Sequence, residues 1–156
     1  MPKPMTVRGE QQLRKELNQL KHGRAEASRA IGEARKLGDL RENADYHAAK
    51  ERQGMMEARI RYLETQLSNA RVIDISKISN TGTVIFGSTV TLEEMESGTE
   101  VRYRIVGEDE ADIKAGTISN VAPLAKAMIG MKQDDSFSVG EDLMQKEYLI
   151  KRIEHI

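Results

Sequence analysis

The chain has no cysteine and no tryptophan, and only 4% of its 156 residues are aromatic. The absence of cysteine excludes disulfides, thiolate metal sites and cysteine nucleophiles. No run approaches the roughly 18 apolar residues that a membrane-spanning helix needs. The first residues also lack the apolar segment of a secretory signal. We therefore expect a cytoplasmic protein that does not enter a membrane.

The chain is rich in charged residues and poor in apolar ones. Charged residues make up 31% of the chain and hydrophobic residues 38%, and the mean hydropathy is -0.57. This composition argues against one core that runs through the whole chain and predicts a mostly solvated element, such as a helical hairpin. Residues 1–75 carry 15 basic and 11 acidic side chains (+4), and residues 76–156 carry 9 and 14 (-5). Either an anionic partner for the first half or chance placement would explain this division.

Two stretches of the first half carry apolar side chains at helical spacing. The first stretch contains Leu13, Leu17, Leu20, Ala27, Ile31 and Ala34, and the second contains Tyr46, Ala49, Gln53, Met56, Ile60, Leu63, Leu67 and Ala70. Seams of this kind predict two helices that pack as an antiparallel coiled coil. The first helix is expected over residues 8–36, Gly38 suits the turn after it, and residues 39–42 can open the second helix.

The second half has the pattern of a small α+β domain. Val101, Tyr103 and Ile105 alternate with arginines and predict a half-buried strand, and residues 148–154 predict a final strand. Pro123 favours the first position of a short helix that Gly130 ends. The expected fold class is α+β, with a hairpin over residues 1–75, a linker over 76–81 and a globular domain over 82–156.

The tip of the predicted hairpin carries two carboxylates, Asp39 and Glu42, and their spacing has two interpretations. Asp39 could cap the second helix with Glu42 as its capping-box partner. Alternatively, the two acids could present a divalent cation to another macromolecule. Mg²⁺ prefers oxygen ligands, and two exposed carboxylates would bind it weakly unless the partner completed the site. Arg35 and Lys50 lie at similar distances from the turn and could converge on a phosphate.

Strings of residues along the whole chain resemble the bacterial transcript cleavage factors of the GreA/GreB family. These strings are residues 5–9, 38–51, 67–74, 84–90, 103–107 and 123–130. The resemblance implies an N-terminal antiparallel coiled-coil hairpin and a C-terminal FKBP-like domain. This chain departs from the family pattern at Val121, Ala122 and Met131, where polar residues are usual. If these positions contact the partner, the contact differs from that of the family.

The same resemblance implies a function and its partners. The hairpin would enter the secondary channel of bacterial RNA polymerase, and the globular domain would hold the polymerase rim. Asp39 and Glu42 would help to hold a Mg²⁺ ion of the polymerase active centre, so that backtracked nascent RNA is cleaved near its 3′ end. Asn43 and Tyr46 would support the tip, and Arg35 and Lys50 would contact the RNA.

On this interpretation the chain is a monomeric accessory factor of the DNA/RNA elongation complex. It is not an enzyme itself, and it binds no metal tightly when isolated. Two alternatives remain at the level of sequence. The chain could block the polymerase channel without activating cleavage. Its second half could also be a prolyl isomerase whose pocket is lined by Phe86, Tyr103, Phe137 and Tyr148.

Overall fold

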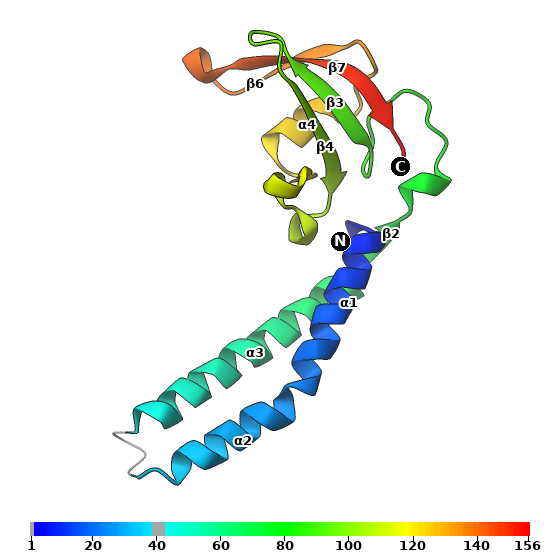
Figure 1. Cartoon of the computed structure of the whole chain (residues 1–156). Helices are drawn as coiled ribbons and strands as arrows, with labels where there is room; N and C mark the ends of the chain where they lie inside the picture. Colours follow the sequence, from blue (N-terminus) through cyan, green and yellow to red (C-terminus); the bar gives the residue numbers. More distant parts are fainter. Residues whose placement is uncertain (1, 39–42) are drawn as a thin grey trace. The chain divides into compact units, whose positions relative to one another are not determined.

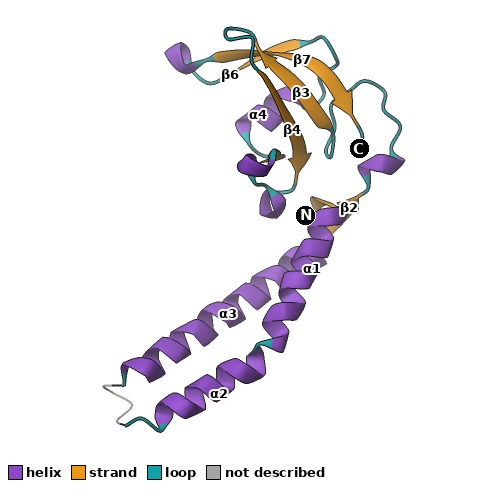
Figure 2. Cartoon of the chain, viewed as in Figure 1, coloured by secondary structure: helices purple, strands orange, loops and turns teal. Residues whose placement is uncertain are grey.

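The computed structural model describes residues 2–38 and 43–156, except for the side chain of residue 142. Its contacts divide the chain into two compact units, Glu10–Ala70 and a second unit made of Met1–Gly9 with Arg71–Ile156. The first unit is helical and the second is rich in strands, which confirms the predicted α+β class with a helical hairpin (Figure 2). The domain bounds of 1–75, 76–81 and 82–156 stay a prediction. Contacts group residues 1–9 with the strand-rich unit.

The hairpin is built from α1 (Val7–His22), α2 (Arg24–Arg35) and α3 (Ala44–Ser68), and α2 runs beside α3 (Figure 1). Every side chain of the two predicted seams is buried or half-buried. Ile60 and Leu63 of α3 are completely buried. The helical periodicity of the sequence therefore identified the packed faces correctly. Within the described residues, none of the helices is long and apolar enough to cross a bilayer.

The predicted helical arm over residues 8–36 is found at residues 7–35, but it is not regular throughout, because Gly23 separates α1 from α2. The Gly23 amide donates to two carbonyl oxygens, those of Gln19 and Leu20, each at 3.1 Å. Its φ and ψ of -78° and -8° depart from the regular helix, although Ala27 still donates to its carbonyl at 3.0 Å. Glycine has a low helix propensity, which explains why the irregularity falls at this residue.

Two ion pairs connect the helices of the hairpin across its surface. Arg24 of α2 donates twice to the Glu57 carboxylate of α3, at 2.9 and 3.0 Å. Arg59 of α3 makes the same two-pronged contact with Glu16 of α1, at 3.0 Å for both bonds. The hydrogen bonds from Arg24 lower the pKa of Glu57, and those bonds likewise raise the pKa of Arg24. Arg24 of α2 thus bridges the two arms of the hairpin.

The strand-rich unit contains a five-stranded sheet in the order β5-β4-β3-β7-β6. The pairs are antiparallel except for β4 with β5, which are parallel. The strands are β3 (Thr89–Glu94), β4 (Glu100–Val106), β5 (Thr117–Ser119), β6 (Ser136–Val139) and β7 (Lys146–Glu154). The predicted strands at 101–105 and 148–154 are confirmed, although β7 begins two residues earlier.

Helix α4 (Pro123–Met128) contributes Ala125 and Met128 to the core on one face of the sheet. Pro123 lies at the start of α4 and Gly130 follows with a φ of 92°, as the sequence predicted. The four aromatic residues proposed for an isomerase pocket all pack in or against this core, and Phe137 stacks on Tyr148 at 5.6 Å. Phe137 is buried, and Phe86, Tyr103 and Tyr148 are half-buried against the core, so this packing does not decide the alternative of a prolyl isomerase.

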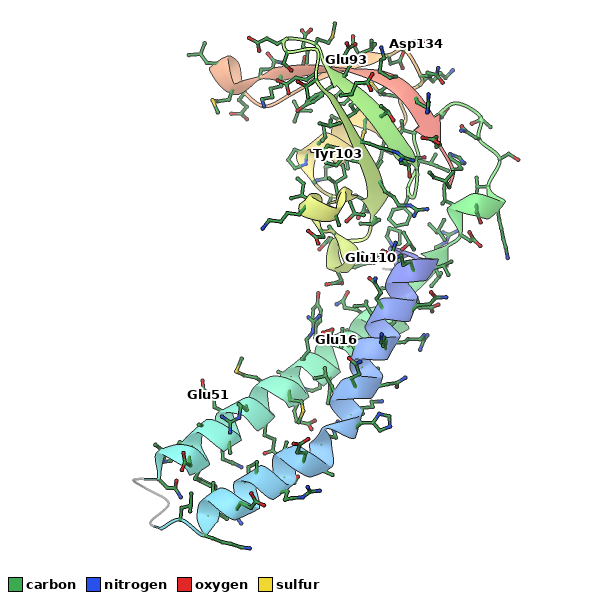
Figure 3. All side chains as sticks on the ribbon, viewed as in Figure 1. Glu16, Glu51, Glu93, Tyr103, Glu110 and Asp134 are labelled. Atoms are coloured by element: carbon green, nitrogen blue, oxygen red, sulfur yellow. The ribbon has the colours of Figure 1, made fainter. Side chains whose placement is uncertain are left out.

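A short two-stranded sheet joins β1 (Lys3–Thr6) to β2 (Ala70–Ile73). The carboxylate of Glu110, at the end of the 3₁₀ turn η2 (Glu108–Glu110), accepts hydrogen bonds from the Thr6 amide and the Gly107 amide, both at 2.9 Å. The Thr6 hydroxyl also donates to it. Glu110, labelled in Figure 3, therefore fastens the N-terminal segment to the strand-rich unit.

Candidate functional site at the hairpin tip

The two predicted site carboxylates, Asp39 and Glu42, lie outside the described residues. The described chain on either side nevertheless defines where they are connected. Helix α2 ends at Arg35, and Gly38 has a φ of 139°, which side-chain-bearing residues rarely adopt. Helix α3 begins at Ala44. The sequence thus places both acids in the connection between the two arms.

The residue that caps α3 is Asn43, so the start of this helix differs from the sequence prediction. Asn43 has an extended backbone, and its side-chain oxygen accepts a hydrogen bond from the Tyr46 amide at 3.0 Å. This is the geometry of a helix N-cap. The cap that the sequence assigned to Asp39 is supplied at α3 by Asn43. Asp39 is therefore not the N-cap of α3, which was the structural role that the capping interpretation gave it.

Asn43 also connects the two arms of the hairpin. Its amide nitrogen donates to the carbonyl oxygen of Ala34, near the end of α2. One side chain thus satisfies a free amide at the start of α3 and adds a second donor to a carbonyl at the end of α2, which also accepts from the Leu37 amide at 3.1 Å. This contact joins the helices immediately beside the segment that carries the acids. A role for Asn43 in supporting the tip stays a prediction, and this geometry gives it a physical basis.

Tyr46 receives a cation from the opposite arm. The guanidinium carbon of Arg35 lies 5.7 Å from the centre of the Tyr46 ring, a cation–π distance. The Tyr46 ring meets His47 edge-on at 5.6 Å. Lys50 is exposed one helical turn after Tyr46, and residues four apart share a helix face. The structure therefore brings Arg35, Tyr46 and Lys50 to one face of the hairpin.

Residues near the tip also line a shallow groove between α2 and α3, with a volume of about 360 Å³. Its described lining consists of Ala30, Glu33, Ala34, Leu37, Asp45, Ala48, Ala49 and Arg52. The small alanine side chains leave this space between the helices. Two of these lining residues, Leu37 and Asp45, are exposed, and Leu37 has 67% of its surface accessible. The apolar seams of the sequence did not predict this groove. One of its lining residues, Leu37, is apolar but does not belong to either seam.

The described residues do not form a metal site on their own. No group of three or more histidine, aspartate or glutamate side chains could hold a metal ion in the part of the chain that the structure covers. The chemistry of Asp39 and Glu42 nevertheless fits Mg²⁺, because carboxylate oxygens are hard ligands of the kind that this ion prefers. Two carboxylates would provide only part of its octahedral shell.

Comparison with known protein families gives matches along almost the entire chain. Residues 3–72 match the family model described as "Transcription elongation factor, N-terminal". Residues 79–155 match the model described as "Transcription elongation factor, GreA/GreB, C-term". The first of these regions contains the complete hairpin, and the second contains the five-stranded sheet.

Individual relatives match over nearly their full length. Transcription elongation factor GreA of Vibrio parahaemolyticus is 54% identical over 98% of both chains. The protein of that name from Pseudomonas putida is 53% identical over 98% of this chain and 96% of its own. The crystal structure of GreA factor homolog 1 of Thermus thermophilus is 26% identical over 99% of both chains. Its TM-score of 0.44 is too low to add to the fold assignment.

Proposed function

Because the chain belongs to the GreA/GreB family of transcription elongation factors, we propose that it makes RNA polymerase cleave the 3′ end of backtracked nascent RNA. The hairpin enters the secondary channel of the polymerase and carries Asp39 and Glu42 to the active centre. The globular unit holds the polymerase from outside. The chain acts as an accessory factor, and the polymerase performs the hydrolysis.

One observation about the tip supports this proposal more than any other. The N-cap of α3 is Asn43, so neither Asp39 nor Glu42 is needed to cap that helix. Two acids that connect the arms of a helical hairpin and do not cap α3 are consistent with binding to a partner. Asn43 and the Arg35–Tyr46 contact hold the two helix ends beside them.

Different residues of the chain would bind the metal ion and the RNA at the active centre. Asp39 and Glu42 would supply carboxylate oxygens that complete a Mg²⁺ site begun by the polymerase. When bound there, Mg²⁺ would lower the pKa of a water molecule and stabilise charge on the phosphate. Arg35 and Lys50 would bind the phosphates of the extruded RNA and hold its 3′ segment in line. Tyr46 orients Arg35 through its ring face.

The experiment compares Asp39→Asn/Glu42→Gln with the wild-type chain on a stalled, backtracked elongation complex. Asparagine and glutamine keep hydrogen-bonding capacity but remove the negative charge that a hard cation demands. We expect unchanged polymerase binding and a loss of RNA cleavage of at least about 100-fold, in the range for loss of a charge-stabilising group. RNA incubated with the protein alone is the control and should stay intact.

Two outcomes would contradict the proposal. If the double variant still stimulated cleavage, the acids would not act on the metal. If the wild-type chain bound the complex and suppressed cleavage, it would be an inhibitor that occupies the channel, which is the alternative left by the sequence.

A further inference from the structure

The five-stranded sheet carries a hollow that contains none of the residues assigned to the proposed function. Val90 and Leu92 of β3 are buried in the core that α4 covers, so Thr91 between them lies on the opposite face of the sheet. The hollow opens on that face across β4, β3 and β7, which are neighbours in the sheet. Its volume of about 580 Å³ is in the range of small-ligand sites.

The register of the strands gathers three cations around this hollow. Thr91 pairs with Arg102 of β4 on one side and with Arg152 of β7 on the other, so the two arginines flank it in one row. The register between β3 and β7 shifts here, because Lys151 is an extra residue between Ile150 and Arg152. Such a bulge changes the direction of a side chain locally. Both arginines and Lys151 line the hollow.

These cations can bind a further anion, because their ion pairs within the unit are loose. A guanidinium nitrogen of Arg102 lies 3.4 Å from the Glu154 carboxylate, and the Lys151 amine lies 3.7 Å from that of Glu93, which Figure 3 labels. The two-pronged pairs of the hairpin close to 2.9–3.0 Å. Within the part of the chain that the structure describes, Arg152 forms no ion pair.

The lining favours a ligand that carries several negative charges close together. Two guanidinium forks on either side of the Thr91 hydroxyl suit the oxygens of phosphate groups, and Lys151 adds a third cation. Glu100 and Glu154 also line the hollow. A singly charged anion therefore gains little there, whereas two linked phosphates can displace Glu154 from Arg102.

Two observations favour a small ligand over a strand of nucleic acid. The described residues that line the hollow include no aromatic side chain, so a base has no ring on which to stack. Residues 76–156 carry a net charge of -5, which repels a long polyanion over the rest of this surface. A compact ligand interacts mainly with the side chains beside it, because salt screens more distant exposed charges.

We propose that the hollow binds a small ligand through a diphosphate group. Arg102 and Arg152 bind its phosphates from the two sides, Lys151 adds a third positive charge, and the Thr91 hydroxyl donates to a phosphate oxygen. Inorganic pyrophosphate and nucleoside diphosphates share this chemistry. The site lies within the strand-rich unit and does not depend on the acids of the hairpin tip.

The test titrates the full-length chain with inorganic pyrophosphate in an isothermal calorimeter, in buffer free of divalent cations so that no metal bound at the tip contributes. We expect one saturable site with a Kd of about 1 mM or lower. Arg102→Gln/Arg152→Gln should raise this Kd at least about tenfold, because both guanidinium forks lose their charge-assisted hydrogen bonds. In nuclear magnetic resonance spectra of the wild-type chain, pyrophosphate should shift the Thr91 amide signal.

The matched control is Lys114→Gln/Lys132→Gln, which removes the same charge from exposed positions of this unit that do not line the hollow. Its Kd should equal that of the wild type, and far-UV circular dichroism should show the same fold for all three proteins. Adenosine diphosphate should compete with pyrophosphate and adenosine should not, because recognition rests on the phosphates.

Several results would overturn the diphosphate site. They are no saturable binding of pyrophosphate, an unmoved Thr91 signal, an unchanged Kd in the glutamine variant of the arginines, or an equal loss in the lysine control. A short single-stranded RNA that displaced pyrophosphate at a lower concentration than adenosine diphosphate would also overturn it, since the site would then be one for nucleic acid. All of these results would leave the proposed RNA cleavage standing.

Discussion

At the scale of single residues, the Asn43 side chain makes two contacts that hold the helix ends at the tip. Its oxygen caps α3 and its amide nitrogen donates to the end of α2. A glutamine at this position would be longer and an aspartate would lack the donor, so neither reproduces both contacts. The residue that fastens the tip is thus the immediate sequence neighbour of the predicted catalytic carboxylate Glu42.

Replacing Asn43 separates the two contacts. We expect Asn43→Ala to destabilise the hairpin by about 2 kcal/mol, of which about 1 kcal/mol is the lost cap and the rest is the lost hydrogen bond to Ala34. Asn43→Asp keeps the capping oxygen and should cost less than the alanine variant. Urea denaturation followed at 222 nm measures both effects. Equal stability of the alanine variant and the wild type would contradict the assigned cap.

The ionisation of Glu57 gives a residue-level prediction on pH. Because hydrogen bonds from Arg24 lower the pKa of Glu57, the ionised carboxylate stabilises the folded hairpin. This contribution is complete above the ordinary glutamate pKa of about 4.3 and is lost as the pH falls through the lowered value. Acid titration of the helical signal should therefore show less pH dependence below pH ~4.3 in Glu57→Gln than in the wild type.

Glu51→Gln is the control for the pH experiment, since it removes an exposed carboxylate from the same helix. Its acid titration should follow that of the wild type. If the Glu57 and Glu51 variants titrated alike, the contact with Arg24 would not contribute to stability in solution.

At the scale of elements, two glycines shape the first arm of the hairpin: Gly23 interrupts it, and Gly38 follows its end. Gly23 lies in right-handed helical space, and an added β-carbon would come no closer than 3.4 Å to the nearest atom, the Leu20 carbonyl oxygen. Gly38 has a φ of 139°. The first glycine only weakens a helix, whereas the second permits a backbone conformation that other residues rarely adopt.

The two glycines should respond oppositely to alanine. We expect Gly23→Ala to stabilise the hairpin by about 0.5–1 kcal/mol, because alanine has the higher helix propensity and meets no severe contact. Gly38→Ala should destabilise it by about 1–3 kcal/mol through backbone strain. Thermal unfolding at 222 nm compares the pair. A loss of stability in the Gly23 variant would show that the interruption between α1 and α2 is needed for packing.

At the scale of the whole molecule, the strand-rich unit is assembled from both ends of the chain. Residues 1–9 join residues 71–156, and Glu110 is the side chain that holds them there. Gly9 lies against the same carboxylate, since a β-carbon added to Gly9 would lie 2.1 Å from the carboxyl carbon of Glu110. The hairpin is thereby inserted between two segments of one folded unit.

Removal of the Glu110 carboxylate should release this N-terminal segment. We expect Glu110→Ala to increase hydrogen exchange at the Thr6 and Gly107 amides at least about tenfold, since each loses a charge-assisted bond. Gly9→Ala should have a similar effect, because it displaces the carboxylate. Glu108→Gln, an exposed position in the same turn, is the control. Unchanged exchange at Thr6 in the alanine variant would mean that the β1–β2 pairing alone fixes the segment.

The sequence alone determined what depends on neighbours within a few turns of chain. Helical spacing identified the buried faces around Ile31 and Ile60, and alternation identified the strand around Tyr103. Pro123 and Gly130 marked the ends of α4. These signals are local, because helix and strand periodicity follow directly from backbone geometry. The spacing of residues also identified the two acids of the tip, and the resemblance to a known family, confirmed by the comparisons, added their proposed role.

Only the tertiary structure decided the features that join distant segments. Asn43 took the cap expected of Asp39 because it also reaches Ala34 across the hairpin. Glu110 binds Thr6, 104 positions away in sequence. Such contacts have no periodic signature in the sequence, since their energy depends on which chain segments the fold brings together.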